Sequence, residues 1–274
     1  MTAFEVFPST TSHKKEPIGP TLEIFARLGL IDLDLNLNHI VDRGESPETI
    51  ERALRANGQR VRMVSGGWCD FFDPEPDVEE TFASVSRQVR LARRFGVDRM
   101  RLFFGRLPAA EWSASRLATI AGNMRRLGDL HPDLLFIFEN HDGASSRPDV
   151  CRAILESVDR RNVRLNFDPI NFEHAGVRAI DALSVIAPHV AHVHLKGYAK
   201  GEFCGFGEGH VDLAPTLEAL VGSGYAGAFT VEYEGTGDRS LRLYQSVGRA
   251  RDAVAALLEA APSSQGASDA AGRA

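Results

Sequence analysis

The chain has 274 residues, of which 43% are hydrophobic and 25% charged, and this composition is typical of a globular protein. A formal net charge of −6 offers no broad basic surface to a phosphate backbone, so we expect no nucleic-acid partner. The three cysteines are far apart, no apolar run approaches the roughly 20 residues of a membrane span, and no signal-like segment begins the chain. We therefore expect a cytoplasmic protein with no disulfide framework and no membrane partner.

The first half of the chain alternates between segments typical of strands and of helices. Strands are predicted at residues 3–7, 31–38, 60–66 and 98–105, and helices at 21–29, from a serine cap at Ser46 onward, at 78–95 and at 114–130. The second strand alternates strictly, with Leu33 and Leu35 on one face and Asp34 and Asn36 on the other. In a barrel, this strand would direct its polar face inward.

The second half continues the same alternation to residue 260. Strands are predicted in the runs 134–143, 163–171, 191–197 and 227–235, with helices at about 149–157, 179–186, 215–221 and 240–260. A glycine-rich loop, residues 196–212, separates the last two strands, and the small, polar tail 261–274 is predicted to be disordered. Eight strands, each followed by a helix, favour a parallel sheet closed into a single (β/α)₈ TIM barrel over residues 1–260.

Residues typical of metal ligands stand where four of these predicted strands end. Glu139, Asp168, His194 and Glu232 each share the inward face by the period-two alternation of a strand. A strand-end acid taken alone could equally cap a neighbouring helix or pair with an arginine. Buried carboxylates are costly unless they are paired or bound to a metal. Three carboxylates with one imidazole suit one divalent ion, with Mn²⁺ preferred over Mg²⁺, Co²⁺ or Zn²⁺.

The motifs around these residues resemble a known family. ENH, NFDPIN and HVHLKG in the fifth to seventh strands, and GEG before the eighth, are similar to the sugar phosphate isomerase/epimerase superfamily of xylose isomerase-like TIM barrels. The resemblance implies a single metal held by Glu139, Asp168, His194 and Glu232. It also implies that Glu139 and Glu232 serve as acid and base, moving a proton beside a carbonyl through an enediolate.

Four further residues are candidates for contact with a substrate. His141 shares the inward face with Glu139, although the same position also fits an exposed loop histidine without a role in the site. Asn171 stands three residues after Asp168, where many members of the family place a histidine. Lys196 would either neutralise an oxyanion or form a salt bridge in the barrel mouth. Trp68, after the third strand, would form an apolar wall of the pocket or serve only in packing.

Several functions are compatible with such a barrel. The resemblance favours an isomerase or epimerase acting on a small ketose or another sugar- or polyol-derived substrate, with a homo-oligomer possible. The alternative is a dehydratase of a keto-inositol or dehydroshikimate-like compound, because the same metal and base would then expel a β-hydroxyl. An endonuclease IV-like enzyme is disfavoured, since the histidines that its metal cluster needs are missing from SGGWCDF, LFFGR and EFCGF. A binding barrel without catalysis is disfavoured by the four intact ligands.

Overall fold

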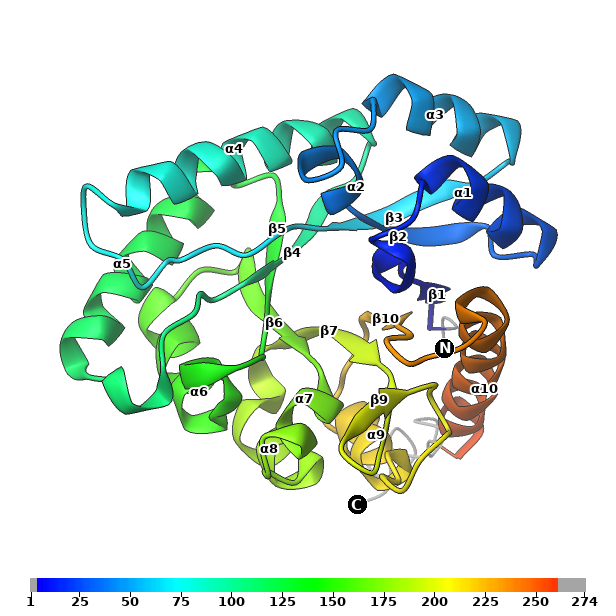
Figure 1. Cartoon of the computed structure of the whole chain (residues 1–274). Helices are drawn as coiled ribbons and strands as arrows, with labels where there is room; N and C mark the ends of the chain where they lie inside the picture. The colour runs from blue at the N-terminus through cyan, green and yellow to red at the C-terminus, as the bar shows by residue number, and fades with distance from the viewer. Residues whose placement is uncertain (1–3, 261–274) are drawn as a thin grey trace, which may run out of the picture.

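The computed structural model describes residues 4–260 and contains a barrel of parallel strands (Figure 1). The barrel strands are β1 (Val6–Pro8), β2 (Asp32–Asn36), β3 (Arg60–Ser65), β4 (Arg99–Phe103), β5 (Leu135–Glu139), β6 (Val163–Phe167), β7 (Val190–Leu195) and β10 (Ala228–Val231). Their order around the sheet is β1-β10-β7-β6-β5-β4-β3-β2, and a single bridge between Ser9 and Asp34 joins its two ends. The predicted TIM barrel is confirmed.

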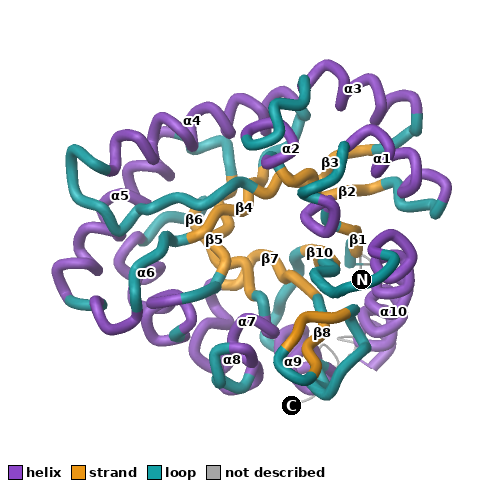
Figure 2. The backbone as a smooth tube through the Cα atoms, viewed as in Figure 1, coloured by secondary structure: helices purple, strands orange, loops and turns teal. Residues whose placement is uncertain are grey.

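Helices surround the strands on the outside of the barrel (Figure 2). They are α1 (Ile18–Arg27), α2 (Asn38–Val41), α3 (Pro47–Ala56), α4 (Val78–Arg94), α5 (Ala114–Leu130), α6 (Pro148–Val158), α7 (Pro169–His174), α8 (Ala179–Ile186), α9 (Ala214–Gly222) and α10 (Arg239–Ala260). The large core fills the space between helices and strands, where outward strand residues such as Leu33, Phe136 and Val193 are fully buried. This burial explains why one face of each strand is uniformly apolar.

Several predicted details are wrong. The first strand begins at Val6 rather than at residue 3, and α1 begins three residues earlier than predicted. Ser46 is the N-cap residue of α3 as predicted, but its hydroxyl makes no capping hydrogen bond and donates to Glu48 Oε2 at 2.6 Å instead. The glycine-rich loop after β7 contains an antiparallel hairpin, β8 (Gly197–Ala199) with β9 (Glu202–Cys204). The predicted disordered tail lies outside the described residues.

The inside of the barrel changes from apolar to polar along its axis. Phe7, Met63 and Ile137 form a small buried cluster in the interior, separate from the main core. Further along the same inward columns, Ile137 is followed by Glu139 in β5, and His192 by His194 in β7. His192, one layer below His194, is fully buried and its Nε2 is hydrogen-bonded to Thr230 Oγ1 at 2.8 Å, so it is a core residue of the barrel interior. The chemically active groups therefore lie at the carboxyl ends of the strands.

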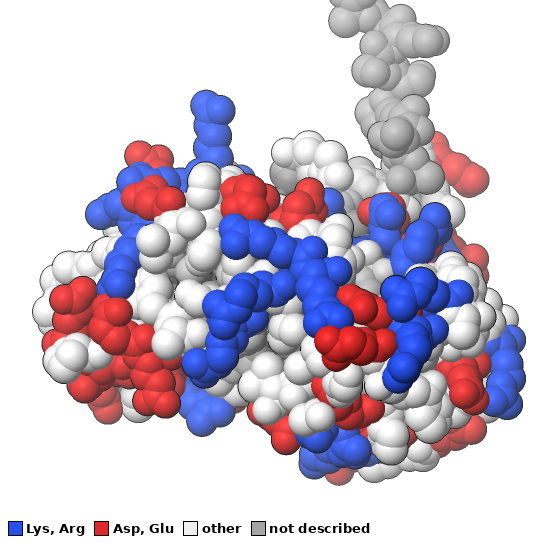
Figure 3. Space-filling model, turned by 90° about the horizontal axis from the view of Figure 1, so that it is seen from above, with Lys and Arg blue, Asp and Glu red and all other residues white. Residues whose placement is uncertain are grey.

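Charged side chains of both signs occupy the surface, and the cysteines form no disulfide among residues 4–260. On the face drawn in Figure 3, basic and acidic side chains are interleaved. Arg94, for example, contacts both Glu48 and Glu51 at 2.8 Å. The three cysteines are free thiols. Among residues 4–260, no helix combines the length and the apolar character needed to cross a bilayer.

Candidate metal centre

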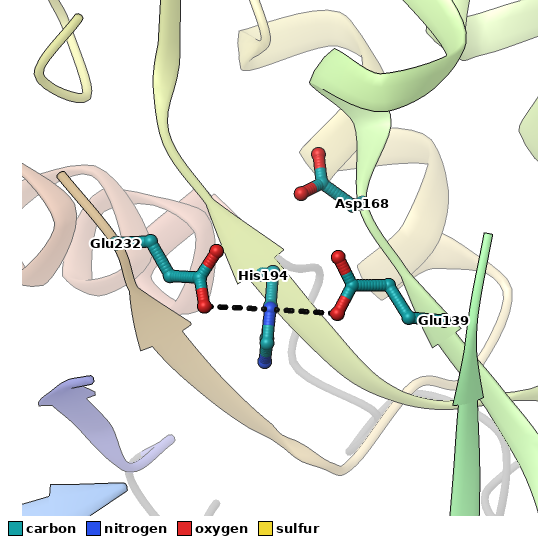
Figure 4. A group of neighbouring side chains, drawn as sticks. All are labelled: Glu139, Asp168, His194 and Glu232. Atoms are coloured by element: carbon teal, nitrogen blue, oxygen red, sulfur yellow. Dashed lines mark ion pairs between the residues drawn. The ribbon is translucent and has the colours of Figure 1, made fainter. Parts of the chain in front are cut away.

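The four predicted ligands converge at the carboxyl end of the barrel. Glu139, Asp168, His194 and Glu232 each offer one ligand atom, and these atoms all lie within 4.8 Å of one another. Figure 4 shows Glu139 and Glu232 on opposite sides of the His194 ring, with Asp168 close to Glu139. All four side chains are at most 4% exposed. The structure thus brings together residues separated by up to 93 positions in the sequence.

Asp168 is fixed by the start of a helix. It is the N-cap of α7, and its Oδ1 accepts hydrogen bonds from the backbone N–H groups of Ile170 and Asn171 at 2.9 and 3.0 Å. Pro169 at the first helical position favours this turn from strand into helix. The capping alternative considered for strand-end acids is therefore realised for one oxygen only. Oδ2 takes no part in the capping and lies 3.1 Å from Lys196 Nζ.

Polar atoms in this cluster lack ordinary hydrogen-bond partners. Among the described residues, Asp168 Oδ2, Glu232 Oε1 and both ring nitrogens of His194 accept or donate no hydrogen bond. His194 Nδ1 lies 3.3 Å from Glu139 Oε2 and 3.4 Å from Glu232 Oε1. Buried polar atoms without partners are rare and call for an explanation. An oxygen-rich set with one imidazole fits a divalent ion of the Mg²⁺, Mn²⁺ or Zn²⁺ type.

The electrostatics of the protein alone show how strongly these groups interact. Burial raises the pKa of Asp168 to about 6, although the charge of Lys196 opposes the rise. Burial by itself would lower the pKa of His194, but Glu232 and Glu139 outweigh it and raise this pKa to about 9. Burial would raise the pKa of Glu232, yet His194 and then Lys196 bring it well below its usual value. Without an ion, a protonated imidazole therefore balances the carboxylates.

Glu139 is held by donors that the sequence analysis did not identify. Arg101, in β4, places Nε 3.1 Å from Glu139 Oε2, and both side chains are only 3% exposed. Asn166 donates to the same oxygen at 3.2 Å, and Asn171 donates to Oε1 at 3.1 Å. A signal for Arg101 existed: it is a charged residue inside the apolar run MRLFF, on the inward face by parity.

Lys196 forms the salt bridge that was one of its two predicted roles. Its Nζ lies 3.1 Å from Asp168 Oδ2 and 3.0 Å from Glu234 Oε2, and the lysine is 1% exposed. The ammonium also lies 4.4 Å from the centre of the Phe203 ring in β9. The unpredicted hairpin therefore covers the cation next to the metal-type cluster.

The remaining substrate candidates differ in their distance from the ligands. Asn171 contacts Glu139 directly, as described above. Trp68 stacks on Phe103 with ring centres 4.2 Å apart, and His141 packs edge-on against both rings at 5.1 Å. Arg101 lies over the Phe103 ring at 4.3 Å. Trp68 and His141 thus belong to an aromatic group that borders the site through Phe103 and Arg101. Among the hydrogen bonds and ion pairs of residues 4–260, neither Trp68 nor His141 contacts one of the four predicted ligands.

A family model described as a xylose isomerase-like TIM barrel matches residues 25–260. The chain belongs to this family. A curated relative, a 3-dehydroshikimate dehydratase of Bacillus anthracis, is 23% identical over 166 residues, which are 57% of this chain and 57% of the relative. An uncharacterized protein, YihM, of Escherichia coli is 28% identical over 117 residues, 42% of this chain and 34% of its own. The chain thus aligns with about a third to three fifths of these relatives' length.

Solved structures of the same fold are similar over most of the chain. A probable 3-DHS dehydratase of Bacillus anthracis matches with a TM-score of 0.75 at 17% identity, covering 89% of this chain and 97% of that one. A D-allulose 3-epimerase of Methylomonas sp. matches with a TM-score of 0.77 at 15% identity, covering 92% and 100%. A family protein of Mycobacterium smegmatis, solved in complex with magnesium, has a TM-score of 0.75 at 17% identity, covering 94% and 100%. Family membership and the buried ligand set together indicate an enzyme with a divalent-metal site.

Proposed function

We propose that this protein is a divalent-metal-dependent dehydratase, a lyase that removes water from a small β-hydroxy carbonyl compound of the dehydroshikimate or keto-inositol kind. The observation that carries the proposal is the unequal environment of the two glutamates. A dehydratase of dehydroshikimate among the curated relatives supports the same choice. Glu139, Asp168, His194 and Glu232 would hold the ion.

The two glutamates are not equivalent as proton acceptors. Glu139 accepts a hydrogen bond on each oxygen, from Asn166 and Asn171, and forms an ion pair with the Arg101 guanidinium, so its carboxylate is held on all sides by protein groups. Glu232 has no such donors, and its Oε1 lacks a hydrogen bond within the described chain. Its low pKa depends largely on protonated His194, and a histidine that ligates a metal is neutral. Glu232 is therefore the better placed base.

A dehydration needs only one such base. A bound divalent ion would polarise the substrate carbonyl and stabilise the negative charge that develops on its oxygen. Glu232 takes the proton from the carbon beside the carbonyl, and the C–O bond to the β-hydroxyl breaks as the C=C bond forms. The Glu232 carboxyl then returns its proton to the departing hydroxide, which leaves as water. Glu139 is held in place by Arg101, Asn166 and Asn171 and takes no part in the proton transfer.

Epimerisation of a ketose is the second candidate. It is favoured by the placement of Glu139 and Glu232 on opposite sides of His194 (Figure 4), since one would remove a proton and the other would return it to the opposite face. Two solved structures with this fold are 3-epimerases of psicose and allulose. In this mechanism, however, Glu139 must accept and donate a proton while contacting Arg101, Asn166 and Asn171.

One experiment separates the two reactions. The Mg²⁺-loaded protein is incubated in D₂O with 3-dehydroshikimate, keto-inositols and ketoses including D-psicose, and the products are followed by NMR. We expect loss of water from an acidic or cyclic substrate, which for dehydroshikimate gives an aromatic dihydroxybenzoate. Deuterium incorporation into a ketose without loss of water would instead establish the epimerase.

Variants then test the assignment of the base. Glu232→Gln should lower kcat by about 10²- to 10⁴-fold, which is the usual contribution of a general base. Glu218→Gln, an equal change on the exposed face of α9, serves as the control and should retain full activity. Full turnover by Glu232→Gln on an identified substrate would refute this mechanism.

A further inference from the structure

A small pocket at the catalytic end of the barrel is rich in positive charge. Its lining includes Ser12, Lys14, Lys15, Glu234 and Arg239, and its volume is about 210 Å³. Three cationic side chains thus face one carboxylate, in a protein whose net charge is −6. The lining comes from the segments that follow β1 and β10, so the pocket lies at the same end of the barrel as the ligand cluster.

The cations of this pocket keep hydrogen-bonding capacity in reserve. Arg239 Nη1 contacts Glu16 Oε1 at 3.0 Å, which uses one of its five N–H donors. Lys14 Nζ lies 3.6 Å from Glu234 Oε1, and Lys15 makes no ion pair with any of residues 4–260. The Glu234 charge is shared, because its other oxygen contacts Lys196 Nζ at 3.0 Å. The hydrogen-bond donors in the pocket therefore outnumber the acceptors that the protein provides for them. An anion entering the pocket would meet these spare donors.

A buried hydroxyl adds a neutral donor to the pocket. Ser12 is 6% exposed, and its Oγ accepts the backbone N–H of Tyr233 at 2.8 Å. A serine hydroxyl also carries one proton to donate, and no acceptor for it appears among the hydrogen bonds of the described residues. A buried donor without an acceptor is costly. A ligand oxygen in the pocket would satisfy it.

The pocket is connected to the ligand cluster by a short series of contacts. Lys14 contacts Glu234, Glu234 contacts Lys196, and Lys196 contacts the ligand Asp168 at 3.1 Å. Only two side chains therefore separate the rim cation from a metal ligand.

We propose that Ser12, Lys14, Lys15 and Arg239 bind a carboxylate of the substrate while its vicinal oxygens lie at the metal-type cluster. This inference rests on the proposed function and sharpens it, because it selects an acidic substrate over a neutral ketose or keto-inositol. Charge-assisted hydrogen bonds to a carboxylate discriminate strongly against an uncharged analogue.

Binding of unreactive ligands tests this pocket separately from catalysis. The probes are 3,4-dihydroxybenzoate and its neutral amide, titrated calorimetrically into the Mg²⁺-loaded protein at low salt, since these exposed cations are screened by ions. We expect the acid to bind about tenfold or more tightly than the amide. Equal affinities for the two compounds would overturn the proposal, whatever reaction the enzyme catalyses.

Variants of the pocket locate the effect. Lys15→Gln and Arg239→Gln should each weaken binding of the acid by roughly 1.5-fold to fivefold, a range set by charged pairs at exposed sites, and leave binding of the amide unchanged. Lys15→Gln breaks no ion pair, so its result does not depend on altered folding. Arg55→Gln, an exposed cation on α3, is the matched control. Equal losses for acid and amide, or tighter binding of fructose 6-phosphate than of the acid, would refute the carboxylate assignment. Turnover of dehydroshikimate decides the proposed function independently.

Discussion

Replacing Arg101 by methionine should destabilise the metal-free protein severely and the metal-loaded protein much less. The guanidinium lies 3.1 Å from Glu139 Oε2 and also donates to the backbone carbonyl of Gly66 at 3.1 Å. Both charged side chains are 3% exposed, so water cannot replace the lost partner. Removing one member of a buried ion pair costs about 3–5 kcal/mol, and Glu139 would keep His194 Nδ1, at 3.3 Å, as its remaining charged partner among the described residues.

The size of the effect translates into a measurable shift. For a chain of this length, 1 kcal/mol corresponds to roughly 2–4 °C in the unfolding temperature, so we expect a fall of about 6–20 °C in the presence of a chelator. A bound divalent ion would supply positive charge beside Glu139, so saturating Mg²⁺ or Mn²⁺ should recover a large part of the loss. Thermal unfolding of wild type and Arg101→Met, each with chelator and with ion, measures both quantities.

Two results would refute the reasoning. If Arg101→Met loses the same stability with and without the ion, the arginine and the ion do not compensate the charge of the same carboxylate. If the loss in chelator is below about 1 kcal/mol, the pair is not an effective buried ion pair. Arg55→Met, an exposed arginine without an ion pair among residues 4–260, should leave the unfolding temperature unchanged.

Three further predictions follow from other features. Chelation should lower the unfolding temperature of the wild type, and re-addition of ion to 100 times its Kd should restore about 2.7 kcal/mol of stability by mass action. If calorimetry shows the same unfolding temperature with chelator and with ion, a structural ion is excluded. Gly143→Ala should destabilise the protein, because φ at this residue is +66° and a Cβ would lie 2.3 Å from the Leu107 carbonyl oxygen. Gly122→Ala in α5 has free space for a Cβ and should stabilise the protein by about 0.5–1 kcal/mol. Urea unfolding of the two variants and the wild type measures both effects. Burial lowers the pKa of His39, so this residue should make stability fall below pH 6.5 by up to about 1.4 kcal/mol per pH unit. Burial also lowers the pKa of His13 and His192, so His39→Leu should reduce, and not abolish, the difference in stability between urea titrations at pH 7.5 and 5.5.

The ligand set could be predicted because it depends on local rules. Strand parity places Glu139 and His194 on the inward face of their strands, and a parallel barrel brings the carboxyl ends of all strands to one rim. Asp168 and Glu232 follow directly after their strands, so an error of one or two residues in a strand boundary does not move them from that rim. The predicted convergence of the four side chains is therefore confirmed, whereas their role as metal ligands stays a prediction.

The partners of the ligands could not be predicted in the same way. Arg101 acts on Glu139 because β4 lies beside β5 with a register that pairs Arg101 with Ile137 and Phe103 with Glu139. That register is a tertiary property that no single strand reveals. The hairpin β8–β9 was missed because its three-residue strands lie in a run of glycines and charged residues without an alternating pattern. Its role in covering Lys196 was missed with it.

The inequality of the two glutamates follows from the order of the strands. Glu139 ends β5, whose neighbour β4 contributes an inward arginine at the right height. Glu232 follows β10, whose neighbours are β7 and β1, and the inward residue of β1 beside Thr230 is the apolar Phe7. No lysine or arginine forms an ion pair with Glu232 in the described chain. Glu139 is thus the more firmly held carboxylate of the two, which is the basis for proposing a reaction with a single base rather than one that needs two.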